Sequence, residues 1–502
     1  MSILTLILVL TSYSTCSGYK LLLVFPFPTL SHSALGEGYV RNLLKAGHEV
    51  TYITPYPIKN DAKELRQIEV MNNTKLFPAT ADIRTGTFLD MMLKLANATV
   101  MHKNVQKLLN DGEQEFDAVI VEWMYSEIYA GFSSVFNCPL IWSSSMEPNA
   151  LLLMLLNEHP NSFSPGLLAS TSNLSLSFWQ RVAEQFQFLY VKFQRWLLAD
   201  KEKSVFNRAF GPATAKRGGI LPCFEVIKYN GSLLLGNSHF STGQTFRLPL
   251  NYIQIAGYHI DENKEPLSMN LQKIMDASKN GVIYFSTAST LRGNTVPNDV
   301  KIGLLDVFKE VNRTVIWQHE GQLKAPKNVQ LFDRVPQQSI LAHPNCVLFV
   351  TSGEYQSIIE AIHFGVPIIG MPIFIDQFKN VDKAVNKGFA KKVDILDIKA
   401  LKAAIDDVLR NTNYRQKAKE LSAIFRDRPI SPDKELVFWV EHVVRTHGAV
   451  HLRSPMLLPW YDTVYSELMI AFMIPLACLC VLIAYLLRRK NEDDYLGFKK
   501  FI

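Results

Sequence analysis

The sequence has 502 residues, of which 48% are apolar and 20% are charged, and its formal net charge is +6. These values exclude a mainly disordered chain, and the length predicts two or three domains. The positive excess is too small and too dispersed to indicate nucleic-acid binding. The high apolar fraction predicts apolar segments outside an ordinary core, and each end of the chain has one.

The N-terminal end, residues 1–18, predicts a secretory signal peptide. Residues 3–10 form an apolar run, and small residues follow up to Gly18. The alternative is a buried first strand, because no Lys or Arg precedes the run. A strand of that kind follows at once at residues 20–25, so the fold does not need the first run.

The C-terminal end predicts a membrane span at residues 468–487, a stretch without any charged residue. Its length suffices to cross a bilayer core of about 30 Å as a helix. Three basic residues follow at 488–490, and positive residues stay in the cytosol, so residues 488–502 form a cytosolic tail. The chain is therefore expected to be a single-pass type I membrane protein. Its Lys-Lys-Phe-Ile ending resembles the dilysine retrieval signal of endoplasmic-reticulum membrane proteins, or is only a basic tail.

Sequons and cysteines agree with a lumenal location and a glycoprotein. The sequons begin at Asn72, Asn97, Asn173, Asn230 and Asn312. Between the two apolar ends, only Cys138, Cys223 and Cys346 occur. An odd and sparse set gives no disulfide framework, so the hydrophobic core has to supply the stability.

Between the ends, the sequence predicts two α/β domains. Residues 20–27 are a continuous apolar run, which is typical of a buried parallel strand. A loop with His32, a helix at 33–46 and a strand at 48–54 follow, which makes a βαβ unit. A second α/β series starts after residue 255, with strand-like segments at 282–286, 314–318, 347–351 and 366–371.

The predicted fold class is therefore α/β, with two Rossmann-like doubly wound domains at residues 19–245 and 246–450. A juxtamembrane linker at 451–467 leads to the membrane helix. A ligand is expected in a cleft at the carboxyl ends of the strands. Residues 150–210 are predicted to be mostly helical and rich in aromatics. They line an apolar acceptor pocket, rest near the membrane, or pack as a core insertion.

The strongest motif is residues 349–380, FVTSGEYQSIIEAIHFGVPIIGMPIFIDQFKN. A buried strand runs into Ser352 and Gly353, where a helix begins. The unpaired N–H groups and positive dipole end of a helix start suit a phosphate. Asp376 and Gln377 lie at the carboxyl end of the next strand, where a carboxylate and an amide can bind sugar hydroxyls.

Over nearly its whole length the chain resembles the membrane-bound UDP-glycosyltransferases of animals, especially insects. The resembling segments are VFPFPTLSH and GHEVTYITP within 24–55, FDAVIVEW at 116–123, NGVIYFS at 280–286, VPQQSILAHPN at 335–345, RDRPISP at 426–432 and HLRSP at 451–455. The resemblance implies a GT-B fold, in which the N-terminal domain binds a lipophilic acceptor and the C-terminal domain binds a UDP-sugar. It implies no cofactor, since the UDP-sugar is a co-substrate. Metal catalysis is not expected either, because the 12 His residues show no ligand-like pairing with Cys or carboxylates.

The resemblance assigns the general base to His32. A neutral imidazole there takes the proton from an acceptor hydroxyl that attacks the anomeric carbon, and the configuration inverts. The family orients this histidine with an aspartate, and the expected counterpart is Glu127, one methylene longer. The alternative for Glu127 is a surface glutamate near a helix start.

The resemblance also transfers donor-binding residues to the C-terminal domain. Gln337 is expected at the uracil and Glu360 at the ribose hydroxyls. Ser289 and Ser357 fall on phosphate-facing positions, and Asp376 and Gln377 fall on the sugar.

Two departures lie at the diphosphate site. The family's Thr-His-Gly-Gly is here Thr-Ser-Gly-Glu, so Ser352 replaces a histidine and Glu354 replaces a glycine. At about 5 Å and an effective dielectric near 20, a carboxylate repels each phosphate charge by roughly 3 kcal/mol. Either Glu354 turns to solvent in a working transferase, or it occupies the anion site of a weakly active or non-catalytic homologue. Such a homologue binds lipophiles or pairs with active relatives.

The expected function is inverting transfer of a hexosyl group to a small lipophilic acceptor in the endoplasmic-reticulum membrane, as in detoxification. The resemblance favours UDP-glucose for an insect source and UDP-glucuronate for a vertebrate one. A membrane-anchored receptor is disfavoured, because it has no need for Glu360, Asp376 and Gln377 in register. Homo-oligomers and hetero-oligomers both stay open.

Overall fold

The computed structural model describes residues 18–71, 73, 85–157, 178–242, 248–286, 298–319, 321, 323–373, 375–395, 397–453 and 466–499. The expected signal peptide up to residue 17 and most of the expected linker, residues 454–465, lie outside the described residues. One compact unit contains both parallel sheets and ends at Arg453; Ser454–Ile502 belong to a second unit.

The N-terminal sheet has seven strands that are all parallel. In chain order they are β1 (Lys20–Val24), β2 (Glu49–Thr54), β3 (Leu65–Glu69), β4 (Ala118–Glu122), β5 (Leu140–Ser144), β6 (Gly231–Gly236) and β7 (Tyr252–Gln254). They lie side by side in the order β3-β2-β1-β4-β5-β6-β7. Their apolar runs follow from burial on both faces of the sheet.

The C-terminal sheet has six parallel strands in the equivalent order, β10-β9-β8-β11-β12-β13. They are β8 (Val282–Ser286), β9 (Thr314–Gln318), β10 (Val329–Phe332), β11 (Cys346–Thr351), β12 (Ile368–Gly370) and β13 (Ala390–Lys392). The two Rossmann-like sheets that the sequence predicts are thereby confirmed. The strand order reverses between β1 and β4, and between β8 and β11, which places a ligand crevice at both carboxyl edges.

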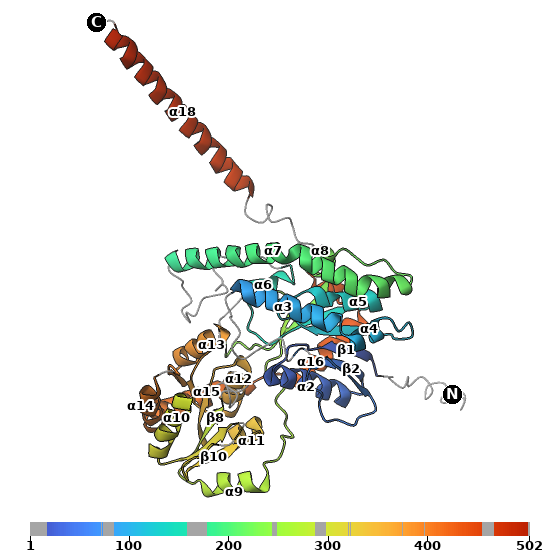
Figure 1. The fold of residues 1–502 in the computed structure, drawn as a ribbon, viewed down its shortest axis with the longest axis vertical. Coiled ribbons are helices and arrows are strands. Elements are labelled where there is room, and N and C mark those ends of the chain that lie inside the picture. Colours follow the sequence, from blue (N-terminus) through green and yellow to red (C-terminus); the bar gives the residue numbers. More distant parts are fainter. Residues whose placement is uncertain are drawn as a thin grey trace, which may run out of the picture. The chain divides into compact units, whose positions relative to one another are not determined.

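Helices cover both sheets (Figure 1). Those that follow strands of the N-terminal sheet are α2 (Leu30–Lys45), α3 (Thr85–Val100), α4 (Lys103–Leu109), the 3₁₀ turn η2 (Ile128–Ala130), α5 (Gly131–Phe136), α6 (Ala150–Met154), α7 (Phe178–Lys216) and α8 (Phe224–Ile227). The helices after β7, in chain order, are α9 (Met269–Ala277), α10 (Asn298–Glu310), α11 (Gln337–Ala342), α12 (Tyr355–Phe364), α13 (Ile375–Asn386), α14 (Ile398–Arg410), α15 (Thr412–Arg426), α16 (Pro432–Arg445), η3 (Val450–Leu452) and α18 (Ser466–Lys499).

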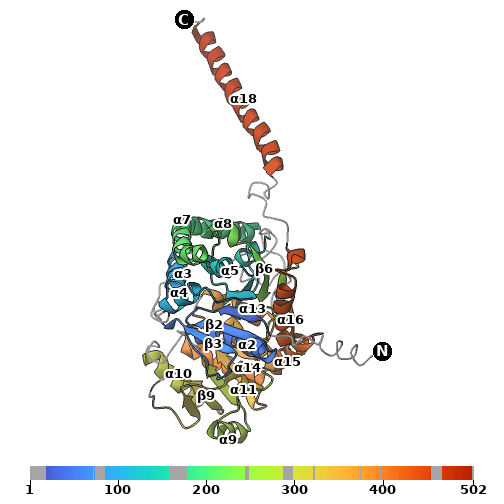
Figure 2. The same cartoon turned by 90° about the vertical axis from the view of Figure 1, so that its right-hand side faces the viewer.

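Two elements lie across the predicted domain boundaries. Strand β7 pairs with β6 in the N-terminal sheet, although the boundary at residue 245 assigns it to the second domain. Helix α16 contacts α2 and lies beside it (Figure 2). Its Leu436, Val440 and Val443 are fully buried in the cluster formed by β1, β4 and β6. The chain thus returns to the N-terminal sheet, because this amphipathic helix completes that core.

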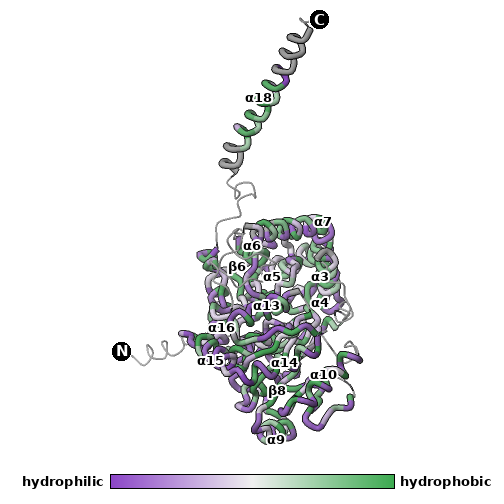
Figure 3. Tube along the Cα trace, turned by 90° about the vertical axis from the view of Figure 1, so that its left-hand side faces the viewer, coloured by the Kyte–Doolittle hydropathy of each residue, from purple (hydrophilic) through white to green (hydrophobic). Residues whose placement is uncertain are grey.

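The expected membrane span is not confirmed. Among the described residues, no helix is both long enough and apolar enough to cross a membrane. Helix α18 contains the expected span and Pro475, and the described middle of the helix is mainly hydrophobic (Figure 3).

Helix α7 is fixed to the N-terminal sheet by a buried ion pair. The Arg195 guanidinium contacts the carboxylate of Glu127, which also accepts a hydrogen bond from Nε1 of Trp123 at 2.7 Å. Glu202 lies about two turns further along α7, on the same face of the helix as Arg195, and is also buried. Burial, together with the charge of Glu127, raises the pKa of Glu202 to about 7, against the opposing effect of Arg195.

This pKa predicts a pH-dependent gain from Glu202→Gln. An unfolded glutamate titrates near 4.5, so wild-type stability falls as the pH rises from there to about 7. The variant lacks this loss, so its Tm should exceed that of the wild type at pH 8 and equal it at pH 4. Thermal unfolding at both pH values measures the difference. Glu115→Gln, at an exposed position, is the control, and an equal shift at both pH values would contradict the prediction.

Candidate active site

His32 lies just beyond the carboxyl end of β1, in the first turn of α2. The side chain of Thr29 caps this helix and accepts a hydrogen bond from the His32 backbone N–H at 3.4 Å. The imidazole packs against Phe27, with 4.5 Å between ring centroids, and 14% of the side chain is exposed. One ring edge is therefore held by the protein while part of the ring stays accessible.

The carboxylate that holds His32 is Glu122. Its Oε1 lies 2.5 Å from His32 Nδ1. Glu122 is the last residue of β4, which pairs directly with β1, and only 1% of its surface is exposed. A proton on Nδ1 is donated to Glu122, which leaves the lone pair of Nε2 available as a base.

The charges around His32 shift its titration upward. Burial alone lowers the pKa of His32, but the charge and hydrogen bond of Glu122 raise it, and the charges of Glu354 and Asp376 raise it further. The net pKa lies above the ordinary histidine value. Two carboxylates that follow β11 and β12 therefore act on a base that follows β1, so the carboxyl edges of both sheets contribute to one site.

The expected pairing of His32 with Glu127 is wrong. Glu127 lies at the start of η2, where its carboxylate is bound by Trp123 and Arg195. It is buried, so the alternative of a surface glutamate is also wrong. The sequence signal for Glu122 was present: a carboxylate ends the apolar run AVIVE, at the carboxyl edge of a strand beside β1.

In the C-terminal half, the structure brings Gln337, Ser357 and Glu360 together as the resemblance implied. Gln337 Nε2 donates to Glu360 Oε2 at 2.7 Å and to Ser357 Oγ at 3.3 Å. Gln337 Oε1 accepts from the hydroxyl of Tyr284 at 3.3 Å. Gln337 and Glu360 thus form one linked pair at the start of α11 and within α12.

Glu360 has further polar neighbours that the sequence did not reveal, two amide donors and an imidazole at ion-pair distance. Its Oε1 lies 3.3 Å from Nε2 of Gln338, of Gln356 and of His259. Burial raises the pKa of Glu360, but His259 and the two glutamines at 337 and 338 outweigh burial, and the pKa is lowered overall. The carboxylate therefore stays ionised although it is 2% exposed. A buried, ionised acceptor suits paired hydroxyl donors.

The loop before α12 has a constrained backbone and a buried hydroxyl. Gly353 has a φ of +87°, and an added Cβ would lie 2.3 Å from Val381, so only glycine fits there. The hydroxyl of Ser352 is fully buried and has no hydrogen-bond partner among the described residues. Glu354 is the N-cap residue of α12, yet its side chain makes no capping hydrogen bond.

The remaining predicted residues are placed unevenly. Asp376 is exposed in the first turn of α13, where Asn380 Nδ2 donates to it at 3.4 Å. Gln377 is buried, and its Oε1 accepts from the backbone of Ile373 at 2.9 Å, so this oxygen supports the turn before α13. Ser289 lies outside the described residues.

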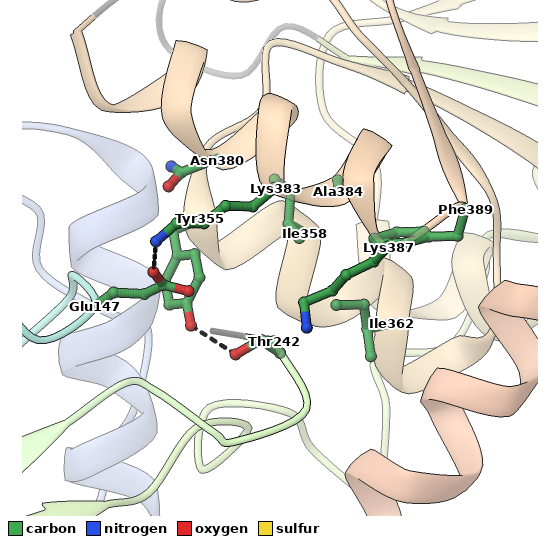
Figure 4. Close-up of a pocket in the computed structure, with 10 residues that line it drawn as sticks. All are labelled: Glu147, Thr242, Tyr355, Ile358, Ile362, Asn380, Lys383, Ala384, Lys387 and Phe389. Atoms are coloured by element: carbon green, nitrogen blue, oxygen red, sulfur yellow. Dashed lines mark hydrogen bonds and ion pairs between the residues drawn. The ribbon is translucent and has the colours of Figure 1, made fainter. Parts of the chain in front are cut away.

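The opposite face of α12 contacts the N-terminal half around a small pocket (Figure 4). The ammonium of Lys383 pairs with Glu147, which follows β5. The hydroxyl of Tyr355 lies 2.8 Å from the Thr242 hydroxyl. The residues at 355, 358 and 362 lie on the helix face opposite 356, 357 and 360, so this pocket is separate from the Gln337–Glu360 pair.

A family model described as "UDP-glucoronosyl and UDP-glucosyl transferase" matches residues 58–500. The chain belongs to this family. It is 29% identical to UDP-glucosyltransferase 2 of Dactylopius coccus over 94% of this chain and 93% of that one. It is 28% identical to UDP-glucuronosyltransferase 2B1 of Rattus norvegicus over 75% of this chain and 70% of that one.

The fold is that of known glycosyltransferases. The solved structure of TcCGT1 in complex with UDP matches with a TM-score of 0.58 and 13% identity, over 86% of this chain and all of that one. The GT-B fold that the resemblance implied is confirmed. The protein is a UDP-glycosyltransferase, and glycosyl transfer from a UDP-sugar is its supported activity.

The two carboxylates 122 and 127 predict different mutant phenotypes. Glu122→Gln should lower kcat by about 10²–10⁴-fold, because His32 loses its orienting anion. Since this anion also raises the pKa of His32, the acid limb of the pH–rate profile should move to lower pH. Glu127→Gln is the matched control: it should lower Tm and leave the acid limb in place. Steady-state kinetics from pH 5 to 9 measures both, and a shifted limb in Glu127→Gln would refute the assignment.

Proposed function

We propose that the enzyme transfers a hexosyl group from a UDP-sugar to a hydroxyl of a small lipophilic acceptor, with inversion and with His32 as general base. The observation that supports this proposal is the 2.5 Å contact between His32 and Glu122 at the switch point of the N-terminal sheet. This contact pairs a basic imidazole with a carboxylate that orients it, at the edge of the sheet where a ligand is expected.

In the proposed reaction, Nε2 of His32 takes the proton of the acceptor hydroxyl. The acceptor oxygen forms a bond to the anomeric carbon as the bond from that carbon to the UDP oxygen breaks on the opposite face. Glu122 stabilises the imidazolium that forms, and UDP leaves with the bonding electron pair. A positioned base of this kind contributes about 10²–10⁴-fold to the rate.

The donor is proposed to bind along α12. Glu360 is suited to accept hydrogen bonds from the ribose hydroxyls. The uracil takes the place of some of the present hydrogen-bond partners of Gln337. The diphosphate lies at the N-terminus of α12, where the Ser352 hydroxyl supplies one donor. Backbone N–H groups and neutral donors can hold a diphosphate without a metal ion or cofactor.

We propose glucose as the sugar, supported by the name of the Dactylopius coccus relative. The proposed location is the endoplasmic-reticulum membrane, with residues 468–487 as the span and the catalytic unit in the lumen. The support is the uncharged run with its basic flank and the Lys-Lys-Phe-Ile ending, whose second lysine lies outside the described residues.

The second candidate is a weakly active or non-catalytic homologue that binds lipophiles or pairs with active relatives. The observation in its favour is Glu354, which is half-buried and whose charge acts on His32. A carboxylate that faces the site rather than solvent repels the diphosphate. The two candidates therefore differ in how strongly UDP binds.

Titration calorimetry with UDP separates the two candidates. If the second candidate holds, the double variant Ser352→His/Glu354→Gly should bind UDP about 100-fold more tightly than the wild type, because about 3 kcal/mol of repulsion is removed. If the transferase holds, Glu354 turns to solvent and the gain should be much smaller. Measurable wild-type binding at millimolar UDP supports the transferase. No wild-type binding together with restored binding in the variant would support the second candidate.

The sugar and the base are tested by product formation with a panel of phenols. UDP-glucose should give the β-glucoside, with the configuration inverted from the α-linked donor. Its kcat/KM should be higher than that of UDP-glucuronate. His32→Ala should lower kcat by about 10²–10⁴-fold without a matching loss of UDP affinity. Retained configuration, or full activity in His32→Ala, would exclude the proposed mechanism.

A further inference from the structure

His259 is a buried histidine that the proposed reaction does not use. It lies beyond β7, where the chain passes from the N-terminal sheet to the C-terminal one, and it is 2% exposed. Its Nε2 lies 3.3 Å from Oε1 of Glu360. Its Nδ1 is buried and has no hydrogen-bond partner among the described residues. The polar edge of this ring is therefore directed at the carboxylate that is proposed to bind the ribose.

Helix α2 fixes the backbone that carries this ring. Asn42 Nδ2 donates to the carbonyl of Tyr258 at 2.9 Å, and Arg41 Nη2 donates to the carbonyl of His259 at 3.1 Å. Gly38 lies one turn earlier on the same face of the helix, and a Cβ there would come within 2.8 Å of the His259 Cα. Glycine permits this close approach, and a larger residue would push His259 away. The position of His259 is thus set by the helix whose first turn carries the proposed base.

Gln338 links the same backbone segment to Glu360. Its Nε2 lies 3.3 Å from the carbonyl oxygen of His259 and 3.3 Å from Oε1 of Glu360. Its Oε1 accepts a hydrogen bond from the backbone N–H of Asp261 at 3.1 Å. The imidazole and the amide therefore act on one carboxylate oxygen, and both depend on the course of residues 259–261.

The charge of the carboxylate also depends on His259. Burial raises the pKa of Glu360, but His259 has the largest effect among the groups that lower it, and the pKa is lowered overall. Two neighbouring hydroxyls can each donate to one oxygen of an ionised carboxylate. This arrangement requires a fixed carboxylate plane, because hydrogen bonds weaken steeply as their angles depart from linear. An imidazole at Oε1 restricts the rotation of that plane.

We propose that His259 is a positioning residue for the donor: it holds the Glu360 carboxylate in the orientation that accepts both ribose hydroxyls, and α2 places it there. This inference rests on the proposed binding of the ribose by Glu360. All the residues involved belong to the compact unit that contains both sheets. Helix α2 then supplies the proposed base in its first turn and, further along, the support of the donor carboxylate, so that one helix positions both substrates.

The test compares the affinities of the full chain for UDP and for deoxyuridine diphosphate (dUDP) by titration calorimetry. The wild type should prefer UDP by about 10–100-fold, the value of one hydrogen bond to a charged group. Glu360→Leu should abolish this preference, and His259→Leu should reduce it by about 5-fold or more, because the carboxylate is no longer held. His259→Gln, whose amide can donate to the same oxygen, should keep most of it. A merely structural role of His259 would lower Tm and weaken both ligands equally, with the preference unchanged.

Gly38→Ala tests the placement of His259 by α2. The added Cβ should displace His259 and reduce the preference for UDP as His259→Leu does. Gly211→Ala, in α7, is the matched control, because a Cβ there meets nothing within 4 Å, and the preference should persist. A preference that is kept in both Gly38→Ala and His259→Leu but lost in Glu360→Leu would overturn the inference and leave the proposed donor site intact.

The same titrations in the Ser352→His/Glu354→Gly background separate this inference from the proposed function, because UDP binding is expected there under either candidate. A preference that His259→Leu reduces in this background supports the inference, whether or not the wild type binds UDP. Equal affinities of the unaltered background for UDP and dUDP would overturn the ribose role of Glu360 and the inference with it.

Discussion

The contact between His32 and Glu122 depends on the pairing of β1 with β4. Both strands are parallel and in register, with Val24 beside Val121, so their carboxyl ends stop at the same level. His32 comes from the helix that follows the first strand, and Glu122 ends the second. The strand order reverses at this pair, which opens room above it. The contact of His32 with Glu122, on which the proposed base depends, therefore follows from one register.

Much of this arrangement was predictable from sequence. The apolar runs predicted both sheets, and the motif from 349 to 380 predicted a helix start after Gly353, where α12 begins at Tyr355; Glu360 came from the family resemblance. The partner of His32 was not, because Glu122 and Glu127 lie in one short segment and differ only in what folds against them. Arg195, which takes Glu127 away from the site, is 68 residues later. The packing of α16 on the N-terminal sheet is likewise a tertiary choice, which its amphipathic pattern leaves open.

The site concentrates negative charge around a ligand that is itself an anion. Glu122, Glu354 and Asp376 all act on His32, while Glu360 is buried and ionised among amides and His259. Oε1 of Glu122 contacts His32, and the Glu360 carboxylate accepts hydrogen bonds from Gln337 and Gln338. Glu354 stands at a helix start, where the dipole stabilises a side-chain carboxylate and a diphosphate alike. The Glu354 carboxylate and the diphosphate of a bound donor would therefore compete for the same helix N-terminus.

Helix α16 determines how the backbone connects the two sheets. The chain crosses from the N-terminal sheet to the C-terminal sheet after β7, and crosses back before α16 buries Leu436 and Val440 beside β1. Two backbone segments, one after β7 and one before α16, therefore join the two halves. The C-terminal sheet is therefore an insertion between β7 and α16, and both of its ends are fixed to the N-terminal sheet.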